Sequence, residues 1–370
     1  MTPEWNALIC KFPKLLITDP DTIYYLTGCC TPGGSFAALV HSHPTTSLIV
    51  RDLESSNYTS MDDTAEMVQY SEEDPIALVA RALGDGDDLQ HFEIGFEAQS
   101  CRMTPLDGKT LMQKLPNSTF TDVSNEMKWM RATKTPDEVQ CIRVAASHVT
   151  AAFEYALPHV RVGMTETELS GLFTLGKMRH GSEWTAYPEF VAFGANGCIG
   201  HHPASPSKTL QENEIVFVEI GACHKRYHAS KMHAFYVGTP PPWFHRLEHC
   251  IRKAMRVAAS VCKPGVCAKV VDKAMRDIIT NAFSECDIVC PHAFRMLRRS
   301  GYSIGIGNAT DWSDGVGRIT PSSTEVLMEG MVLHLIPWIH VNGVGAMGFS
   351  DIVEVTSDGM ISLFETPMEV

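Results

Sequence analysis

The chain lacks long hydrophobic runs, and it has fewer basic residues than acidic ones. No apolar stretch approaches the roughly 20 residues that cross a bilayer, and the first residues, MTPEWNALICKFPK, contain no hydrophobic signal core. The 30 Lys and Arg residues against 43 Asp and Glu give a formal net charge of −13, whereas nucleic acid and anionic membranes both attract clustered cations. We therefore expect a cytoplasmic protein without a nucleic-acid or membrane partner.

The 12 cysteines show no disulfide or metal-binding pattern. None of them has C-x-x-C spacing with a second pair to face it. In a cytoplasmic protein most of them should be reduced. We predict that they fill the core, and that the protein uses no cysteine-bound zinc or redox group. The near pairs are Cys29–Cys30, Cys262–Cys267 and Cys286–Cys290.

The length of 370 residues predicts two domains, and the composition of 44% hydrophobic and 20% charged residues is typical of globular proteins. In the N-terminal part, residues 14–28 indicate a strand, an Asp-Pro-Asp turn and a helix start. Further strands are predicted at 37–40, 47–50 and 92–96, and a helix at 74–83. This alternation of strands and helices predicts an α/β domain.

A domain boundary is predicted near residues 124–135, with domains at 1–128 and 129–370. Thr135 with Glu138, and Thr165 with Glu168, have the spacing of capping boxes, so a helix should start after each threonine. The second domain should be α+β, with helices packed over mainly antiparallel hairpins. Its other elements are predicted as helices at 243–261 and 269–283 and strands at 332–336 and 352–355.

Residues 214–238, EIVFVEIGACHKRYHASKMHAFYVG, predict a hairpin of two strands around a polar turn. Glu219 lies within the apolar run of the first strand, where a carboxylate is unfavourable to bury without a partner. Two interpretations remain open. Glu219 binds or attacks a substrate, or it is a structural carboxylate paired with Arg226 or Lys231.

Several motifs follow one another along the chain: DPDTIYYLTG, MKWMRATKTPDEVQCIRVAASHV, VGMTETEL, GANGCIGHHPA, the Glu219 hairpin, GYSIGIG, MEGMVLHLIPW and SDIVEVTSDG. Their order resembles the creatinase, aminopeptidase P and methionine aminopeptidase superfamily, whose catalytic domain has the pita-bread fold. Glu219, the run Arg226-Tyr227-His228, and Asp311-Trp312 after GYSIGIG resemble the ectoine hydrolases within that superfamily.

The resemblance also implies which residues replace the metal ligands of the peptidases. Their two aspartates, histidine and two glutamates correspond to Glu219, Ser230, Tyr302, Ile336 and Ser350. A pair of hard divalent cations requires several anionic oxygen ligands, and this set provides one carboxylate. We therefore predict no metal and no other cofactor.

The candidate catalytic residues are His201 and Glu219. His201, in Gly-His-His-Pro, matches the pocket histidine that transfers protons in creatinase, and an imidazole exchanges protons near neutral pH. The neighbouring His202 is predicted to have no catalytic role, and the run RMLRR at 295–299 is interpreted as a solvated face. The predicted substrate-binding residues are Tyr227, His228, His233, Tyr302, Asp351 and Trp312.

The resemblance implies a metal-independent hydrolase that cleaves a C–N bond in a cyclic amidine, guanidine or amide of a small polar metabolite, and a homodimer. Departures from ectoine hydrolase, such as His233 where that group has an arginine, leave the substrate open. Three alternatives stay open as well. They are a lyase or cyclase on the same scaffold, an inactive pseudo-peptidase binding module, and a metal-dependent X-Pro aminopeptidase.

Overall fold

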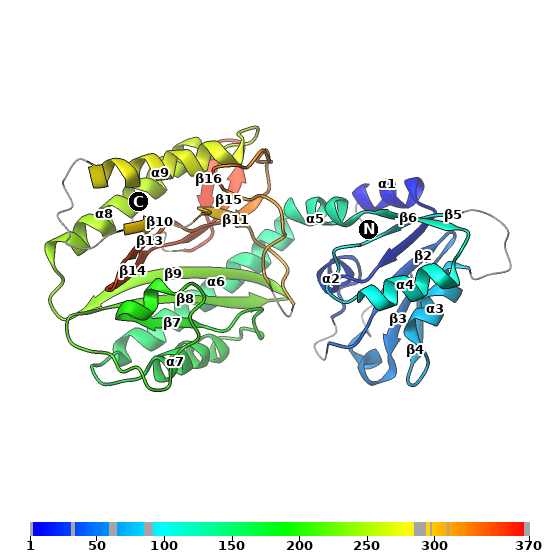
Figure 1. Ribbon diagram of the computed structural model, residues 1–370, viewed down its shortest axis with the longest axis horizontal. Helices are drawn as coiled ribbons and strands as arrows, with labels where there is room; N and C mark the ends of the chain where they lie inside the picture. The colour runs from blue at the N-terminus through cyan, green and yellow to red at the C-terminus, as the bar shows by residue number, and fades with distance from the viewer. Residues whose placement is uncertain are drawn as a thin grey trace. The chain divides into compact units, whose positions relative to one another are not determined.

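The computed structural model of the protein describes residues 3–30, 34–58, 65–84, 92–284, 294–296, 298–308 and 311–365. The chain divides into two compact units, Met1–Arg131 and Ala132–Val370. Each unit has its own β-sheet structure and its own covering helices (Figure 1).

The first unit is built on one six-stranded sheet. Its strand order is β4-β3-β2-β1-β5-β6, in which β1, β5 and β6 run parallel and β2 is antiparallel to both of its neighbours. The strands are β1 (Lys14–Ile17), β2 (Ala38–Ser42), β3 (Thr45–Arg51), β4 (Glu66–Tyr70), β5 (Phe92–Phe96) and β6 (Ser118–Asp122).

Helices cover both faces of this sheet because successive residues of a strand point to opposite sides. Leu15 and Ile17 of β1 pack in one core with side chains of α1 (Pro3–Lys11), α2 (Pro20–Thr27) and α5 (Ser124–Ala132). Leu16 packs in the other core with α3 (Pro75–Leu83) and α4 (Pro105–Lys114). The predicted α/β class is confirmed.

The predicted signals for helix starts are also confirmed. Asp19 caps α2 by accepting a hydrogen bond from the Asp21 backbone N–H at 3.0 Å. In the second unit, capping boxes at Thr135 and Thr165 open α6 (Pro136–Ala156) and α7 (Glu166–Arg179). Helices α8 (Pro242–Val261) and α9 (Ala268–Ser284) lie close to the predicted ranges.

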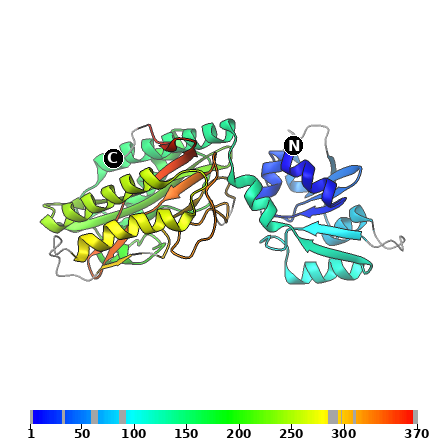
Figure 2. The same cartoon turned by 90° about the horizontal axis from the view of Figure 1, so that it is seen from above.

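In the described part of the second unit, three antiparallel sheets lie between these helices, which confirms the predicted α+β class (Figure 2). Helix α6 packs on β8 and β9, while α8 packs on α9, β14 and β16. The sheets are β7 (Phe190–Phe193), β8 (Glu214–His224) and β9 (Tyr227–Val237); β10 (Phe294–Met296), β13 (Trp338–Val341) and β14 (Gly345–Gly348); and β11 (Gly301–Ser303), β12 (Val332–Leu335), β15 (Asp351–Thr356) and β16 (Gly359–Ser362).

The predicted hairpin is the centre of this unit. Strands β8 and β9 pair from His224↔Tyr227 to Glu214↔Val237 around a two-residue turn, Lys225-Arg226, in which both residues have positive φ. The outer edge of β9 is hydrogen-bonded to later segments of the unit. The His228 N–H donates to Gly305 O, and the Ser350 N–H donates to Met232 O. Residues far apart in sequence therefore meet on β9.

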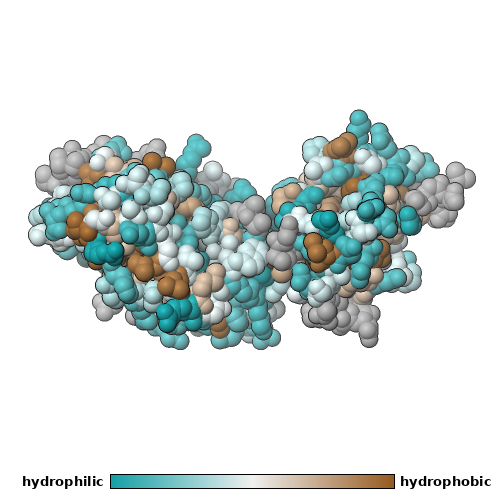
Figure 3. All heavy atoms as spheres, turned by 90° about the horizontal axis from the view of Figure 1, so that it is seen from below, coloured by the Kyte–Doolittle hydropathy of each residue, from teal (hydrophilic) through white to brown (hydrophobic). Residues whose placement is uncertain are grey.

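The face seen in Figure 3 is mostly hydrophilic, with hydrophobic side chains scattered among the polar ones. Single exposed apolar residues of this kind are usual on soluble domains. No helix in the described part of the chain is long and apolar enough to span a bilayer.

Candidate active site

The centre of the candidate site is the face of β8 that carries Glu219. The strand register places Glu219 opposite Phe190 of β7 and Met232 of β9, so these side chains share one face. Glu219 is only 5% exposed, and burial raises the pKa of its carboxyl group from 4.5 to about 7, against the opposing charge of Arg299. Among the described residues, none donates a hydrogen bond to it.

The two cations considered as structural partners of Glu219 lie elsewhere. Arg226 is bound to Glu183 at 3.4 Å and donates to the backbone oxygen of Trp184 at 2.7 Å. Lys231 pairs in register with Ile220, so it lies on the opposite face of the hairpin. The carboxyl group of Glu219 is therefore available for a ligand.

Trp312 covers the same face two residues further along β8. A Cβ atom at Gly221 would overlap the Trp312 ring, with Cη2 only 3.0 Å away, so the glycine makes room for the indole. Trp312 is 1% exposed, and the ring of Tyr187 meets it edge-on with a centroid separation of 4.7 Å. Trp312 and Tyr302, two of the predicted substrate-binding residues, lie together on this side of the unit.

Tyr302 joins Trp312 to a histidine that the sequence analysis missed. The Trp312 Nε1–H donates to Tyr302 Oη at 2.9 Å, and His334 Nδ1 lies 3.0 Å from the same oxygen. His334 Nε2 lies 2.8 Å from Ser350 Oγ, which accepts a hydrogen bond from the Met232 backbone N–H. Burial lowers the pKa of His334 to about 3 and raises the pKa of Tyr302, to which the charge of Glu219 adds.

His201 lies beside this face on the loop that follows β7. Its ring stacks on Phe190, the register partner of Glu219, with centroids 4.8 Å apart and an interplanar angle of 10°. Although the residue as a whole is exposed, partial burial and the charge of Arg299 lower the pKa of His201, while Asp311 opposes the change. The two predicted catalytic residues therefore both lie next to Phe190.

The loop that carries His201 is fixed by a buried acid. Glu166, in the first turn of α7, accepts hydrogen bonds from the backbone of Phe193 at 2.7 Å and of Ser205 at 2.8 Å. It also accepts one from His202 Nε2 at 2.9 Å. His202 therefore has a structural partner, and its lack of a catalytic role stays a prediction.

Arg299 is a second residue that the sequence analysis missed. Its run was interpreted as a solvated face, and Arg299 is indeed exposed, but its guanidinium lies 4.4 Å from the centroid of the Tyr302 ring. Its positive charge lowers the pKa of Glu219, His201 and His334 alike. No Asp or Glu of the described residues forms an ion pair with it.

Tyr187 and Asp311 complete the rim of the site. Burial raises the pKa of Tyr187 to about 12, and the charge of Asp311, with which it shares a hydrogen bond, adds to the increase. Neither residue was a candidate in the sequence analysis, because an isolated tyrosine in a loop gives no signal of its partner.

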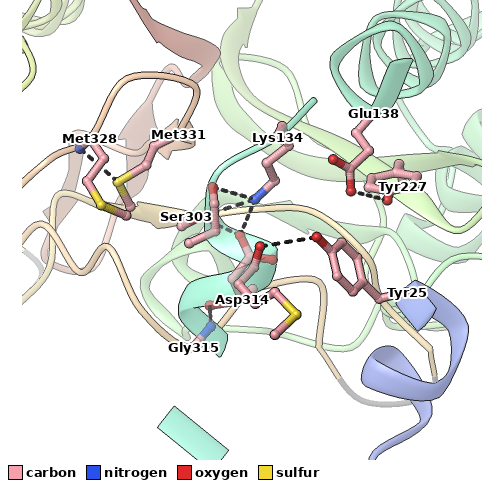
Figure 4. Close-up of polar contacts among 12 residues, drawn as sticks. Tyr25, Lys134, Glu138, Tyr227, Ser303, Asp314, Gly315, Met328 and Met331 are labelled. Atoms are coloured by element: carbon pink, nitrogen blue, oxygen red, sulfur yellow. Dashed lines mark hydrogen bonds and ion pairs between the residues drawn. The ribbon is translucent and has the colours of Figure 1, made fainter. Parts of the chain in front are cut away.

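Three predicted substrate-binding residues lie away from Glu219. Tyr227 points toward α6, where its hydroxyl donates to Glu138 Oε1 at 2.5 Å (Figure 4). His233 packs between Phe153 and Phe349, on the face opposite to Glu219. Asp351 accepts a hydrogen bond from Ser362 Oγ at 2.8 Å, and burial raises its pKa to about 6.

His228 lies on the same strand face as Glu219, but both of its ring nitrogens are hydrogen-bonded within the protein. Its Nδ1–H donates to the Arg226 backbone oxygen at 3.0 Å, and its Nε2 accepts from the Ala186 N–H at 3.1 Å. Burial lowers its pKa to about 3, so the ring is neutral and its centroid lies 5.8 Å from that of Trp312. It supports the tryptophan rather than facing a ligand.

A buried ion pair fixes the segment that carries Trp312. Lys134 binds Asp314, which also accepts a hydrogen bond from Ser303, the residue after Tyr302 (Figure 4). The Asp314 N–H donates in turn to Ser303 O at 3.1 Å. The segments that carry Trp312 and Tyr302 are thus joined by side-chain and backbone hydrogen bonds.

The residues at the five former ligand positions do not fit a pair of divalent cations. Glu219 is the single carboxylate, Ser230 donates to the Ile220 backbone oxygen at 3.1 Å, and the Tyr302 and Ser350 hydroxyls belong to the network with His334. Ile336 provides no donor. Within the ranges that the structure describes, no group of three or more His, Cys, Asp or Glu side chains is placed to hold a metal ion.

Residues 140–357 match the metallopeptidase family M24, and residues 13–133 match the creatinase/prolidase N-terminal domain. The chain belongs to family M24. The predicted recognition of the creatinase and aminopeptidase P group is thereby confirmed. This M24 chain is 28% identical to the ectoine hydrolase of Halomonas elongata over 291 residues, covering 75% of this chain and 69% of that protein. It is 25% identical to the Xaa-Pro dipeptidase of Lactobacillus helveticus over 359 residues, covering 96% and 93%.

Solved structures confirm the pita-bread fold of the M24 unit and the creatinase-type fold before it. The prolidase of Pyrococcus horikoshii superposes with a TM-score of 0.84 at 21% identity, covering 99% of this chain and 98% of that one. The X-Pro aminopeptidase of Thermotoga maritima gives a TM-score of 0.81 at 22% identity, covering 98% and 97%. Members of the family are hydrolases, and their substrates differ between the two curated relatives.

Proposed function

We propose that this protein is a metal-independent hydrolase that cleaves a C–N bond in a cyclic amidine, guanidine or amide of a small polar molecule. The observation that supports this most directly is Glu219. It is a buried carboxyl group with no hydrogen-bond donor among the described residues, on a face walled by Trp312 and Tyr187. A carboxylate beside aromatic faces suits a cationic or strongly polar group of a substrate.

Glu219 and His201 divide the proton transfers. In its ionised form Glu219 removes a proton from water, whose oxygen then bonds to the electrophilic carbon of the substrate. The C–N bond breaks, and His201 carries the proton to the departing nitrogen, so that one water is added across the bond. A carboxyl pKa of about 7 lets Glu219 accept and return a proton near neutral pH, and burial, which lowers the pKa of His201, favours the neutral imidazole that accepts the proton.

The Glu219→Gln and His201→Ala variants should each lower turnover by at least about 10²-fold, the usual contribution of a general acid or base. Their melting temperatures near neutral pH should not fall. The matched controls are Glu154→Gln and His249→Ala, since both residues are exposed on helices away from the site. Turnover is to be followed by mass spectrometry with cyclic amidines, guanidino acids and acylated diamines.

The mass of the product also separates hydrolysis from the lyase or cyclase alternative, because only hydrolysis adds a water. Full activity of Glu219→Gln would contradict the proposal. The inactive-module alternative predicts that none of these compounds turns over, although one of them or a peptide still binds in a calorimetric titration. We further propose a cytoplasmic homodimer with a small-molecule substrate, which light scattering at a single-chain mass of 40.8 kDa would contradict.

A further inference from the structure

Four side chains form an unbroken hydrogen-bonded line behind Glu219: Trp312, Tyr302, His334 and Ser350. Tyr302 and His334 are direct register partners on β11 and β12. The two ends of the line are fixed by groups that can only donate, the Trp312 indole N–H at Tyr302 and the Met232 backbone N–H at Ser350. The direction of the inner two contacts therefore follows from counting protons.

The three groups at the inner contacts carry three protons, whereas the two contacts between them can use only two. The Tyr302 hydroxyl, the neutral His334 ring and the Ser350 hydroxyl each carry one proton, and only two contacts join them. A neutral imidazole has one N–H, so it donates at one nitrogen and accepts at the other. One hydroxyl proton must therefore point out of the line, either at Ser350 or at Tyr302.

The Ser350 end offers no place for the surplus proton. Ser350 is 0% exposed, and no described residue provides a further acceptor for its hydroxyl. A buried donor without an acceptor costs about 1–3 kcal/mol. At the other end no described residue accepts from Tyr302 Oη either, but the charge of Glu219 acts on Tyr302, and the carboxyl oxygens of Glu219 have no donor among the described residues.

We propose that His334 is a positioning residue that donates from Nδ1 to Tyr302 Oη and so turns the Tyr302 hydroxyl toward Glu219. Ser350 donates to His334 Nε2 and fixes this tautomer. Two donors on the phenol oxygen also make its own O–H a stronger donor, because hydrogen bonds in a chain polarise one another. The proposal rests on the site of the proposed function, but not on its reaction.

The tautomer is measurable without any substrate. In protein labelled with ¹⁵N at histidine, the His334 signals are those absent from the His334→Asn variant. We expect the proton on Nδ1, with Nε2 as an acceptor. A proton on Nε2 would reverse the line, place the surplus proton at Ser350, and overturn the proposal.

Infrared titration of the Glu219 carboxyl provides a second readout that is also independent of activity. The band is assigned by its absence in Glu219→Gln. Loss of the donor in Tyr302→Phe should raise the pKa of Glu219 by about 1, since a hydrogen bond to a carboxylate favours its charged form. His334→Leu should raise it by less. Arg299 and Tyr187, the other charged or titratable groups whose interactions with Glu219 are evident, stay unchanged in these variants.

A double variant separates positioning from mere structural support. If His334 acts through Tyr302, Tyr302→Phe with His334→Leu should have the same Glu219 pKa as Tyr302→Phe alone. His334→Asn, whose amide can still donate toward Tyr302, should restore most of the wild-type value. Additive increases, or no change in Tyr302→Phe, would contradict the assignment even if the protein proved to be an active hydrolase.

Discussion

Glu219 is the residue on which the candidate chemistry depends, and its environment has a consequence for stability. The folded protein holds the Glu219 proton more tightly than the unfolded chain does, because burial raises the pKa from 4.5 to about 7. Ionising this carboxyl therefore opposes folding. The protein retains an acid that destabilises it at neutral pH, which is typical of a functional group and not of a structural one.

This linkage predicts a pH-dependent difference between the wild type and Glu219→Gln. The wild-type stability should fall as the pH rises from about 4.5 to about 7, whereas the amide variant does not lose this contribution. The free-energy difference of unfolding should grow in favour of Glu219→Gln over this range by on the order of 3 kcal/mol. Urea unfolding of both proteins at several pH values measures it, and a constant difference would show that Glu219 is not desolvated.

Arg299 acts on the site through its charge. Because its guanidinium lowers the pKa of Glu219 and of His201, Arg299→Gln should raise both. The acidic limb of the kcat/KM profile should then move to higher pH, by less than about one pH unit because water and salt screen an exposed charge. The acidic limb of the wild-type kcat/KM profile should also move to higher pH when the ionic strength is raised.

Arg298→Gln is the matched control, since the two arginines are adjacent and both exposed. No charge effect of Arg298 on the site residues is resolved, so its profile should match the wild type. If Arg298→Gln and Arg299→Gln moved the acidic limb of the kcat/KM profile equally, the effect would come from net charge and not from the position of Arg299 beside the Tyr302 ring.

At the scale of elements, local signals predicted most of the framework. The capping boxes of α6 and α7, and the apolar β8 with its hairpin, are encoded within a few residues, so their positions followed from the sequence. It was harder to predict on which face of the sheet each strand residue lies. Tyr227 and His233 belong to the predicted hairpin, but in register they lie opposite to Glu219, because side chains alternate along β9.

Two residues of the site were missed in the sequence analysis for a different reason. His334 reaches Tyr302 only through the pairing of β11 with β12, and Arg299 joins the site through the Tyr302 ring. These strands have three or four residues, too few to show an alternating pattern. Contacts of this kind depend on long-range packing that no local motif records.

The docking of Trp312 predicts the effect of one methyl group. Gly221→Ala would place a Cβ against the indole, so Trp312 must move or β8 must bend. Overpacking of this kind costs about 1–3 kcal/mol. We expect that loss in the free energy of unfolding, together with reduced turnover because Trp312 holds the Tyr302 hydroxyl.

Gly171→Ala provides the matched control. Gly171 lies within α7 and has no atom near the position of an added Cβ. Alanine there should stabilise the protein by about 0.5–1 kcal/mol, since it favours the helix more than glycine does. If Gly221→Ala proved as stable and active as this control, Trp312 would not be the wall of the site.

At the scale of the whole molecule, the fold is that of a metallopeptidase family, whereas the side chains at the matched ligand positions do not fit a pair of metal ions. The chain matches a metallopeptidase family over residues 140–357, and it superposes on a prolidase over almost its full length. The fold of that family is thus retained, and the resemblance in sequence matches five residues of this chain to its metal-ligand positions. The side chains at those positions are instead one acid, three hydroxyls and an isoleucine, and two of the hydroxyls are joined by His334.

Metal content is the whole-molecule test of this difference. A single carboxylate with neutral hydroxyl neighbours cannot offset the charge of two divalent cations, so purified protein should contain well under one equivalent of manganese, cobalt or zinc. Treatment with a chelator should leave both the melting temperature and the turnover unchanged, and added metal should not raise either. Elemental analysis after dialysis measures the first point. Two tightly bound equivalents, lost together with activity on chelation, would instead support an X-Pro dipeptidase and contradict the role assigned to Glu219 as an acid–base group.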